Sequence, residues 1–129
     1  MARLIVLDAS VAIAALSVED AHHDAAVDAL VAASDDEFVV AATTRAEILV
    51  GPARVGGKVL ATARDFADGC ETVPVSAAIA DDAAALKARH RGLSLPDAIA
   101  HVVAEVIVAD AVWTFDRRWR DVHQRVTIP

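Results

Sequence analysis

Four acidic residues of this sequence lie at positions from which they could act together on a substrate. Three follow apolar runs that predict buried strands, either directly or within the next helix, and the fourth opens the helix that leads into the last of these runs. Carboxylate oxygens are the ligands that Mg²⁺ and Mn²⁺ prefer. A pair of such ions lowers the pKa of a water molecule and stabilises both oxygens of an in-line phosphoryl displacement. The four candidate metal ligands and catalytic residues are Asp8, Glu47, Asp97 and Asp116.

Each of these carboxylates also has a structural explanation. Asp8 can cap the helix that follows it, and Asp116 can belong to a turn. The segments 44–47 and 94–97 both fit the capping-box pattern, in which a polar side chain bonds back to the start of its helix. Four carboxylates at one edge of a sheet would raise one another's pKa unless a cation lay between them. The sequence therefore permits a metal site and leaves the capping roles open.

Strands and helices alternate along the chain, as judged from short apolar runs and from apolar residues at helical spacing. The predicted strands are Leu4–Leu7, Phe38–Ala41, Thr72–Val75, Val112–Phe115 and Val126–Ile128. The predicted helices are Val11–Leu16, Glu19–Ala33, Thr43–Val50, Val59–Ala67, Ser76–Arg91 and Asp97–Val106. This order predicts an α/β fold, a three-layer α/β/α sandwich with a short, mainly parallel central sheet. Ligands of such sheets bind beyond the carboxyl ends of the strands, where the acidic residues are expected.

Length and composition set limits on the class of protein. A chain of 129 residues predicts a single domain over residues 1–129, and 56% hydrophobic residues exclude a disordered chain. The longest apolar stretch, 98–109, contains His101 and Glu105 and is too short to cross a membrane. Cys70 is the only cysteine, which excludes an internal disulfide and a cysteine-based metal site. We expect a cytoplasmic protein with no membrane contact and with Cys70 buried in its core.

Charge is distributed unevenly along the sequence. The chain has 12 basic and 19 acidic residues, a net charge of −7, which alone argues against a nucleic-acid partner. Residues 1–86 hold 5 basic and 14 acidic residues, whereas residues 87–129 hold 7 basic and 5 acidic ones. Several arginines follow Asp116 directly, and Arg45 lies near Glu47. Arg45, Arg117 and Arg118 are therefore candidate contacts to RNA phosphates, the alternative being salt bridges at the protein surface.

Four short motifs occur in an order that resembles the PIN-domain ribonucleases, and in particular the VapC toxins of bacterial toxin–antitoxin pairs. The resemblance extends from the first predicted strand to Pro129. The motifs are Leu7-Asp8-Ala9-Ser10, Ala46-Glu47-Ile48, Leu95-Pro96-Asp97-Ala98-Ile99-Ala100 and Thr114-Phe115-Asp116-Arg117-Arg118-Trp119.

The resemblance implies an endoribonuclease that cleaves single-stranded regions of RNA with a water molecule activated by Mg²⁺ or Mn²⁺. It assigns Asp8, Glu47, Asp97 and Asp116 to the acidic positions of the family, and Ser10 and Thr114 to the hydroxyls that orient a carboxylate or a metal-bound water. It also implies a VapB-like antitoxin, a homodimer and a toxin–antitoxin hetero-oligomer as assemblies. The apolar segment 11–16 would help form the groove for the antitoxin.

Two departures from the family pattern concern the strand that leads to Asp116. Relatives commonly have a glycine turn where this chain has Ala109-Asp110-Ala111. Phe115 stands where relatives often have a small, polar or basic residue, which indicates a difference in how the substrate enters.

Two other functions remain open from the sequence. In the first, the chain is a catalytically silent α/β module that binds a protein partner, and the acidic residues are only helix caps. In the second, Asp8 forms an aspartyl-phosphate during phosphoryl transfer. That chemistry would call for a second aspartate where Ser10 stands, or a lysine at a strand end, and the only lysines are Lys58 and Lys87. The two tryptophans, Trp113 and Trp119, are expected in the core.

Overall fold

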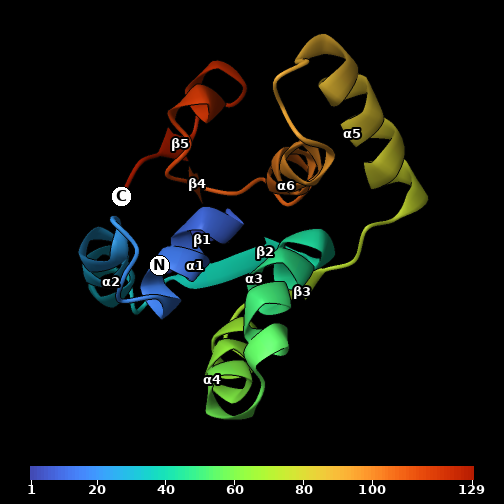
Figure 1. Ribbon diagram of the computed structural model, residues 1–129. Coiled ribbons are helices and arrows are strands. Elements are labelled where there is room, and N and C mark those ends of the chain that lie inside the picture. The colour runs from blue at the N-terminus through green and yellow to red at the C-terminus, as the bar shows by residue number, and fades with distance from the viewer.

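The computed structural model describes residues 1–129 and contains one five-stranded sheet (Figure 1). All neighbouring strands are parallel, and their order in the sheet is β3-β2-β1-β4-β5. The strands are β1 (Leu4–Leu7), β2 (Glu37–Ala41), β3 (Glu71–Val73), β4 (Ala111–Trp113) and β5 (Val126–Thr127). The strand that comes first in the chain is therefore the central one, with one neighbour from each half of the sequence.

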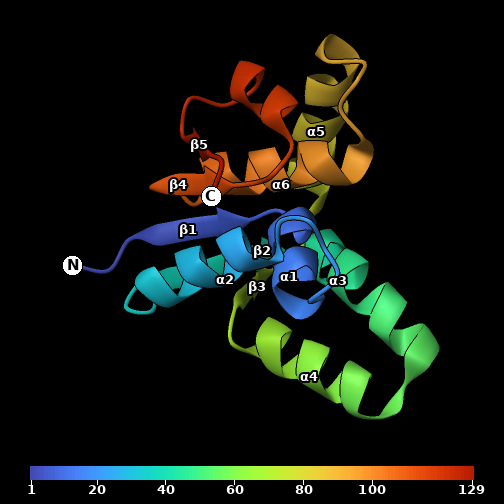
Figure 2. The ribbon, with the colours of Figure 1, turned by 60° about the vertical axis from the view of Figure 1, so that its left-hand side comes forward.

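Helices cover both faces of this sheet (Figure 2). The α-helices are α1 (Ala9–Leu16), α2 (His23–Ala32), α3 (Ala42–Val55), α4 (Gly57–Asp68), α5 (Ala77–Arg89) and α6 (Leu95–Val106), and a short 3₁₀ helix η1 spans Arg117–Asp121. Helices α5 and α6 pack together on one face of the sheet, and α1 and α2 pack on the other. Helix α3 packs against α1, and α4 packs against α3. The predicted three-layer α/β/α sandwich is confirmed.

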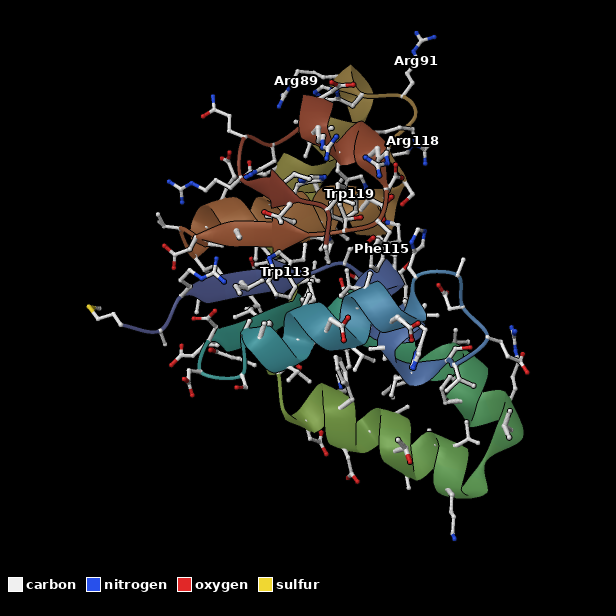
Figure 3. The ribbon with its side chains drawn as sticks, turned by 90° about the vertical axis from the view of Figure 1, so that its left-hand side faces the viewer. Arg89, Arg91, Trp113, Phe115, Arg118 and Trp119 are labelled. Atoms are coloured by element: carbon white, nitrogen blue, oxygen red, sulfur yellow. The ribbon has the colours of Figure 1, made fainter.

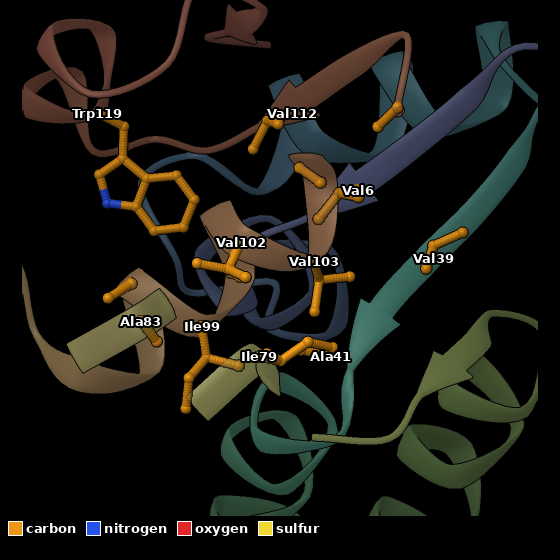
Figure 4. Close-up of a cluster of buried hydrophobic side chains, with 14 of the residues drawn as sticks. Val6, Val39, Ala41, Ile79, Ala83, Ile99, Val102, Val103, Val112 and Trp119 are labelled. Carbon is orange, nitrogen blue, oxygen red and sulfur yellow. The ribbon is translucent and has the colours of Figure 1, made fainter. Parts of the chain in front are cut away.

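The sheet divides the core into two clusters because neighbouring side chains of a strand point to opposite faces. Val6 of β1 packs on the α6 side with Val103, Val112 and Trp119 (Figure 4). Ile5 and Leu7 pack on the other side against alanines of α1 and α2. Strand β1 is thus covered on both faces, as its uninterrupted apolar run predicts. Both tryptophans are buried as expected, whereas Cys70 is only half-buried.

Some element boundaries differ from the sequence-based prediction. The helix predicted to begin at Glu19 begins at His23, because residues 17–22 form turns between α1 and α2. The helix predicted to end at Val50 continues through Pro52 to Val55, so the Gly51-Pro52 pair does not form a turn. The chain reverses instead at Gly56 and Gly57, whose φ angles of 78° and 56° favour glycine.

The turn before β4 is formed without a glycine. Val108 has a φ of 54°, a left-handed conformation that is unfavourable for a β-branched residue. The neighbouring Ala109 is fully buried, and its carbonyl accepts a hydrogen bond from Arg125. The departure noted at residues 109–111 therefore coincides with backbone strain at the preceding residue. None of the helices is both long and apolar enough to span a membrane.

Candidate active site

Asp8 lies at the carboxyl end of β1 and is held by two hydroxyl groups. Its Oδ2 accepts hydrogen bonds from Ser10 Oγ at 2.7 Å and from Thr114 Oγ1 at 2.8 Å. The side chain makes no capping hydrogen bond to α1, although Asp8 occupies the N-cap position. Burial raises the pKa of this carboxyl, and the nearby Asp97 raises it further. The hydrogen bonds from Ser10 and Thr114 lower it in part. Asp8 is therefore a fixed, buried carboxylate and not a helix cap.

The same hydroxyls connect Asp8 to the loop after β4. Ser10 Oγ accepts a hydrogen bond from the backbone N–H of Phe115 at 3.1 Å, and Thr114 Oγ1 accepts one from that of Asp116 at 2.9 Å. Each hydroxyl thus donates to Asp8 and accepts from the loop. These hydrogen bonds fix the position of the Asp116 backbone relative to Asp8.

Glu47 faces the same region from the second turn of α3. Helix α3 begins at Ala42 and Thr44 is buried within it, so the capping box predicted for residues 44–47 does not form. Burial, together with Asp8 and Asp97, raises the pKa of Glu47 to about 7. A carboxyl group that shares its surroundings with two other carboxyls is the situation in which a cation is stabilising.

Asp97 stands in the first turn of α6, where Ser94 Oγ accepts a hydrogen bond from its backbone N–H at 3.2 Å. Burial is the main cause that raises the pKa of its carboxyl, and Asp116 adds to it. Trp119 lowers the pKa of Asp97, although the buried Nε1–H of Trp119 has no hydrogen-bond partner of ordinary geometry. The cap that fixes Asp97 is therefore provided by Ser94, and the Asp97 carboxylate remains available to a ligand.

Asp116 is paired with Arg118. Its Oδ1 accepts hydrogen bonds from the backbone N–H and the Nε of Arg118 at 3.0 and 2.9 Å, and its Oδ2 accepts one from Nη2 at 2.7 Å. These contacts lower the pKa of Asp116. The Arg118 side chain is 77% exposed and that of Asp116 is 24% exposed, so the ion pair lies at the protein surface.

The four acidic residues thus influence one another without forming a finished coordination site. Asp97 raises the pKa of Asp8, Asp8 and Asp97 both raise the pKa of Glu47, and Asp116 raises the pKa of Asp97. No three His, Cys, Asp or Glu side chains are close enough together to hold a metal ion as they stand. The donor set consists of carboxylate oxygens alone, which suits Mg²⁺ or Mn²⁺, and mutual repulsion among the acids favours a cation. The residues fit such an ion once their side chains adjust.

The three candidate arginines have different surroundings. Arg45 bonds Asp68 Oδ1 at 2.7 Å, which directs its guanidinium toward the end of α4. Arg118 forms a salt bridge with Asp116 at the protein surface, which is the alternative to a phosphate contact. Arg117 is exposed and takes part in none of the ion pairs. Arg117 and Arg118 begin η1 directly after Asp116, and Arg118 contacts the Asp116 carboxylate.

Two features near the site were not predicted from the sequence. His22, in the turn before α2, stacks on Phe115 with ring centroids 4.2 Å apart and planes 8° apart. His101, one turn after Asp97 in α6, is buried with both ring nitrogens unpaired and lies against Trp119. Burial lowers the pKa of His101 to about 4. No local pattern marks either contact, since both join segments distant in sequence.

The largest cavities lie away from the acidic residues. One, of about 470 Å³, is lined by α5 and α6 residues that include Arg89, His90 and His101. A smaller one, of about 170 Å³, includes Asp116 and Arg118 together with the loop that precedes α6. None of these cavities is lined by Asp8, Glu47 or Asp97.

Comparisons with known proteins agree with this architecture. The PIN domain family model matches residues 5–124. No curated protein sequence matches the chain. The chain is similar in structure to VapC20 of Mycobacterium tuberculosis, a toxin described as cleaving the sarcin-ricin loop, with a TM-score of 0.78, 20% identity and coverage of 92% of this chain and 94% of that chain.

Two further solved structures are similar. A toxin–antitoxin complex from Klebsiella pneumoniae has a TM-score of 0.81 and 22% identity, covering 97% of this chain and 97% of that chain. VapBC2 from Rickettsia felis, bound to a DNA fragment from their promoter, has a TM-score of 0.67 and 14% identity, covering 95% of this chain and 96% of that chain. At these identities the likeness establishes the fold.

Proposed function

Since the chain belongs to the PIN domain family, we propose that it is a metal-dependent endoribonuclease toxin that cleaves single-stranded RNA and is inhibited by a VapB-like antitoxin. The observation that carries this proposal is the buried Asp8 carboxylate, held by two hydroxyls at the carboxyl end of β1, with Asp97 near enough to raise its pKa and with both residues raising the pKa of Glu47. The likeness to VapC toxin structures supports it at the level of the fold.

The four acidic residues provide oxygen donors from different elements in the proposed reaction. A Mg²⁺ or Mn²⁺ ion held by these carboxylates would supply an acidified water molecule for in-line attack on the phosphodiester, and the products would carry a 5′-phosphate and a 3′-hydroxyl. Asp8 presents a carboxylate whose orientation is fixed by Ser10 and Thr114. Glu47 and Asp97 complete the oxygen donor set from α3 and α6, and Asp116 joins it when its carboxylate leaves Arg118.

Arginines beside Asp116 are the proposed contacts to the RNA backbone. Arg117 is unpaired, and Arg118 is free to exchange Asp116 for a phosphate because its side chain is largely exposed. Arg45, which bonds Asp68, is the weaker of the three candidates. Such contacts position the strand without reading its sequence.

The proposed antitoxin surface lies on the opposite side of α1 from the sheet. Ile13 is 40% exposed on α1, and Val55 and Val59, at the junction of α3 and α4, are 70% and 49% exposed. A shallow cavity of about 280 Å³ between Leu16, Pro52 and Val59 lies among them. Lys58 lines this cavity, whereas residues 1–86 as a whole are acidic and favour a partner segment that carries basic residues around its apolar contact.

The decisive experiment compares RNA cleavage by the wild type with that by Asp97→Ala in Mg²⁺. We expect the variant to lose at least about 100-fold in rate, since even residues that only support a metal ligand cost 10–100-fold when removed. Asp81→Ala, which removes an exposed acid of α5, is the matched control and should cleave normally. Equal cleavage by the wild type and Asp97→Ala would contradict the proposal. On induction, the wild type and Asp81→Ala should arrest growth, and Asp97→Ala should not.

One observation favours the alternative of a catalytically silent binding module. The Asp116 carboxylate is paired with Arg118, which is a structural role that needs no metal ion. Calorimetry with Mn²⁺ separates the two functions, because acids that act only in the fold bind no ion. The aspartyl-phosphate alternative finds no support at Asp8, since Lys87 donates to the carbonyl of Leu93 and Lys58 lies on α4.

A further inference from the structure

His22 and Phe115 form a parallel aromatic pair at the edge of the carboxylate site. Their centroids are 4.2 Å apart and their planes are inclined by 8°. Phe115 is half-buried and packs against the core cluster on the α1 side, so His22 covers it on the solvent side. His22 is exposed, and its backbone N–H is held by Asp20 Oδ1 at 2.8 Å. The pair thus presents a flat, supported ring to solvent.

This pair is linked to the carboxylates by hydrogen bonds. The backbone N–H of Phe115 donates to Ser10 Oγ at 3.1 Å, and the same hydroxyl donates to Asp8 Oδ2 at 2.7 Å. Asp116 follows Phe115 directly in the chain. The position of the aromatic pair is therefore fixed relative to the residues proposed to act on the phosphodiester.

Charge differs between the two sides of Phe115. The turn that contains His22 also contains Glu19 and Asp20, and Asp24 follows in the first turn of α2; these acids repel a phosphate group. Arg117 and Arg118, which follow Phe115 in the chain, attract a phosphate group. Figure 3 shows that Phe115 and Arg118 lie on the same side of the molecule. A nucleotide bound here therefore has its phosphate toward the arginines and its base toward the aromatic pair.

We propose that the outer face of His22, supported by Phe115, stacks one nucleobase of the RNA substrate beside the carboxylate site. This subsite rests on the proposed ribonuclease function and adds a contact to the base, which the acids and arginines do not provide. Single-stranded RNA offers unpaired bases, which proteins stack on aromatic rings with little dependence on sequence.

The test measures RNA binding in a background that cannot cleave, Asp97→Asn. The probes are a fluorescein-labelled 12-nucleotide oligoadenylate and an abasic oligomer of the same length. His22→Ala and Phe115→Leu should each weaken oligoadenylate binding by about 10-fold, the effect of losing one stacked base. Both should change binding of the abasic oligomer less than about twofold. His22→Phe, which keeps the stack, should retain the preference for the oligomer with bases.

Controls separate this subsite from the other contacts. Arg118→Ala should weaken both probes, because it contacts phosphate. His23→Ala is the matched histidine variant, since the His23 ring bonds the Ala14 carbonyl and has no role in stacking. If His22→Ala weakens both probes equally, or neither, the subsite is wrong while the ribonuclease proposal stands. If the background binds neither probe and the wild type cleaves no RNA in Mg²⁺, both proposals fail. His22 is exposed, so its variants test the subsite even if Phe115→Leu unfolds.

Discussion

The pKa of Glu47 lies near neutral pH in the folded chain. Its pKa is raised from 4.5 to about 7 in the folded chain. Between these values the folded state holds a proton that the unfolded state has lost, so the stability from this group is present below pH 4.5 and is lost as the pH rises through 7. Acid conditions therefore favour the metal-free fold at this position, and neutral conditions favour a bound cation.

We predict that Glu47→Gln reduces the pH dependence of stability. Between pH 5 and pH 8 the metal-free wild type should lose about 3–5 °C more in Tm than the variant, the shift that roughly 1 kcal/mol produces in a domain of this size. Thermal unfolding followed by circular dichroism measures this difference. Asp81→Asn is the control for a general loss of charge, and an identical pH profile for wild type and Glu47→Gln would contradict the assignment.

Arg118 occupies the position of a competing cation. Because it bonds both oxygens of Asp116, it must leave before that carboxylate can bind an ion. We predict that Arg118→Gln raises the affinity for Mn²⁺ by about 2–5-fold, in line with the modest strength of exposed ion pairs. Isothermal titration calorimetry measures the affinity. Arg120→Gln, in the same 3₁₀ helix but without an ion pair, should leave it unchanged.

At the scale of the elements, the turn between α6 and β4 is the strained connection. Val108 has a φ of 54° and is 68% exposed, so replacing it removes strain and buries or exposes little apolar surface. We predict that Val108→Gly stabilises the protein by about 0.5–1 kcal/mol, the cost of left-handed geometry less the added freedom of glycine in the unfolded chain. Urea unfolding measures the free energy of unfolding.

The control for this turn is Val106→Gly. Val106 ends α6 and is 58% exposed, so it matches Val108 in type and exposure but has helical geometry. Glycine should destabilise the protein there by about 0.3–0.5 kcal/mol, because valine is already a weaker helix former than alanine. Equal effects of the two substitutions would show that the conformation of Val108 carries no strain.

The elements themselves were largely predictable, and the contacts between them were not. The apolar run at residues 4–7 identifies a strand buried on both faces, and strand ends locate Asp8 and Asp116. Glu47 was open to a capping role because the true start of α3, two residues before Thr44, depends on packing. The Asp116–Arg118 pair was one of two alternatives, and the His22–Phe115 stack was not foreseen, since residues separated by most of the chain have no local signal.

For the whole molecule, the uneven charge decides how RNA is approached. The net charge of −7 disfavours nucleic acid, yet residues 87–129 hold 7 of the 12 basic residues. We predict that replacing Arg117 and Arg118 by alanine lowers the slope of log Kd against log salt by about 1.4, or about 0.7 for each phosphate of a single strand that the protein no longer neutralises. Fluorescence anisotropy with a labelled oligonucleotide measures the slope.

The control pair for this measurement is Arg54 and Lys58. Both lie around the junction of α3 and α4, away from Asp116 in the fold. Their replacement by alanine removes the same charge and should leave the slope unchanged. A similar decrease in slope for both pairs would mean that RNA is attracted by overall charge and not by the arginines of η1.

The central place of β1 has a consequence for how the protein is made. Strand β1 pairs with β4, and Thr114 bonds Asp8 across 106 residues of chain. Parallel pairing over such separations is slow, because a long loop must close before any contact forms. During translation the segment with Asp8 and Glu47 leaves the ribosome long before Thr114 and Asp116. A nascent or truncated chain that lacks β4 thus carries Asp8 and Glu47 with only the Ser10 hydroxyl to orient Asp8, and the site is assembled only after the segment with Thr114 and Asp116 has been made.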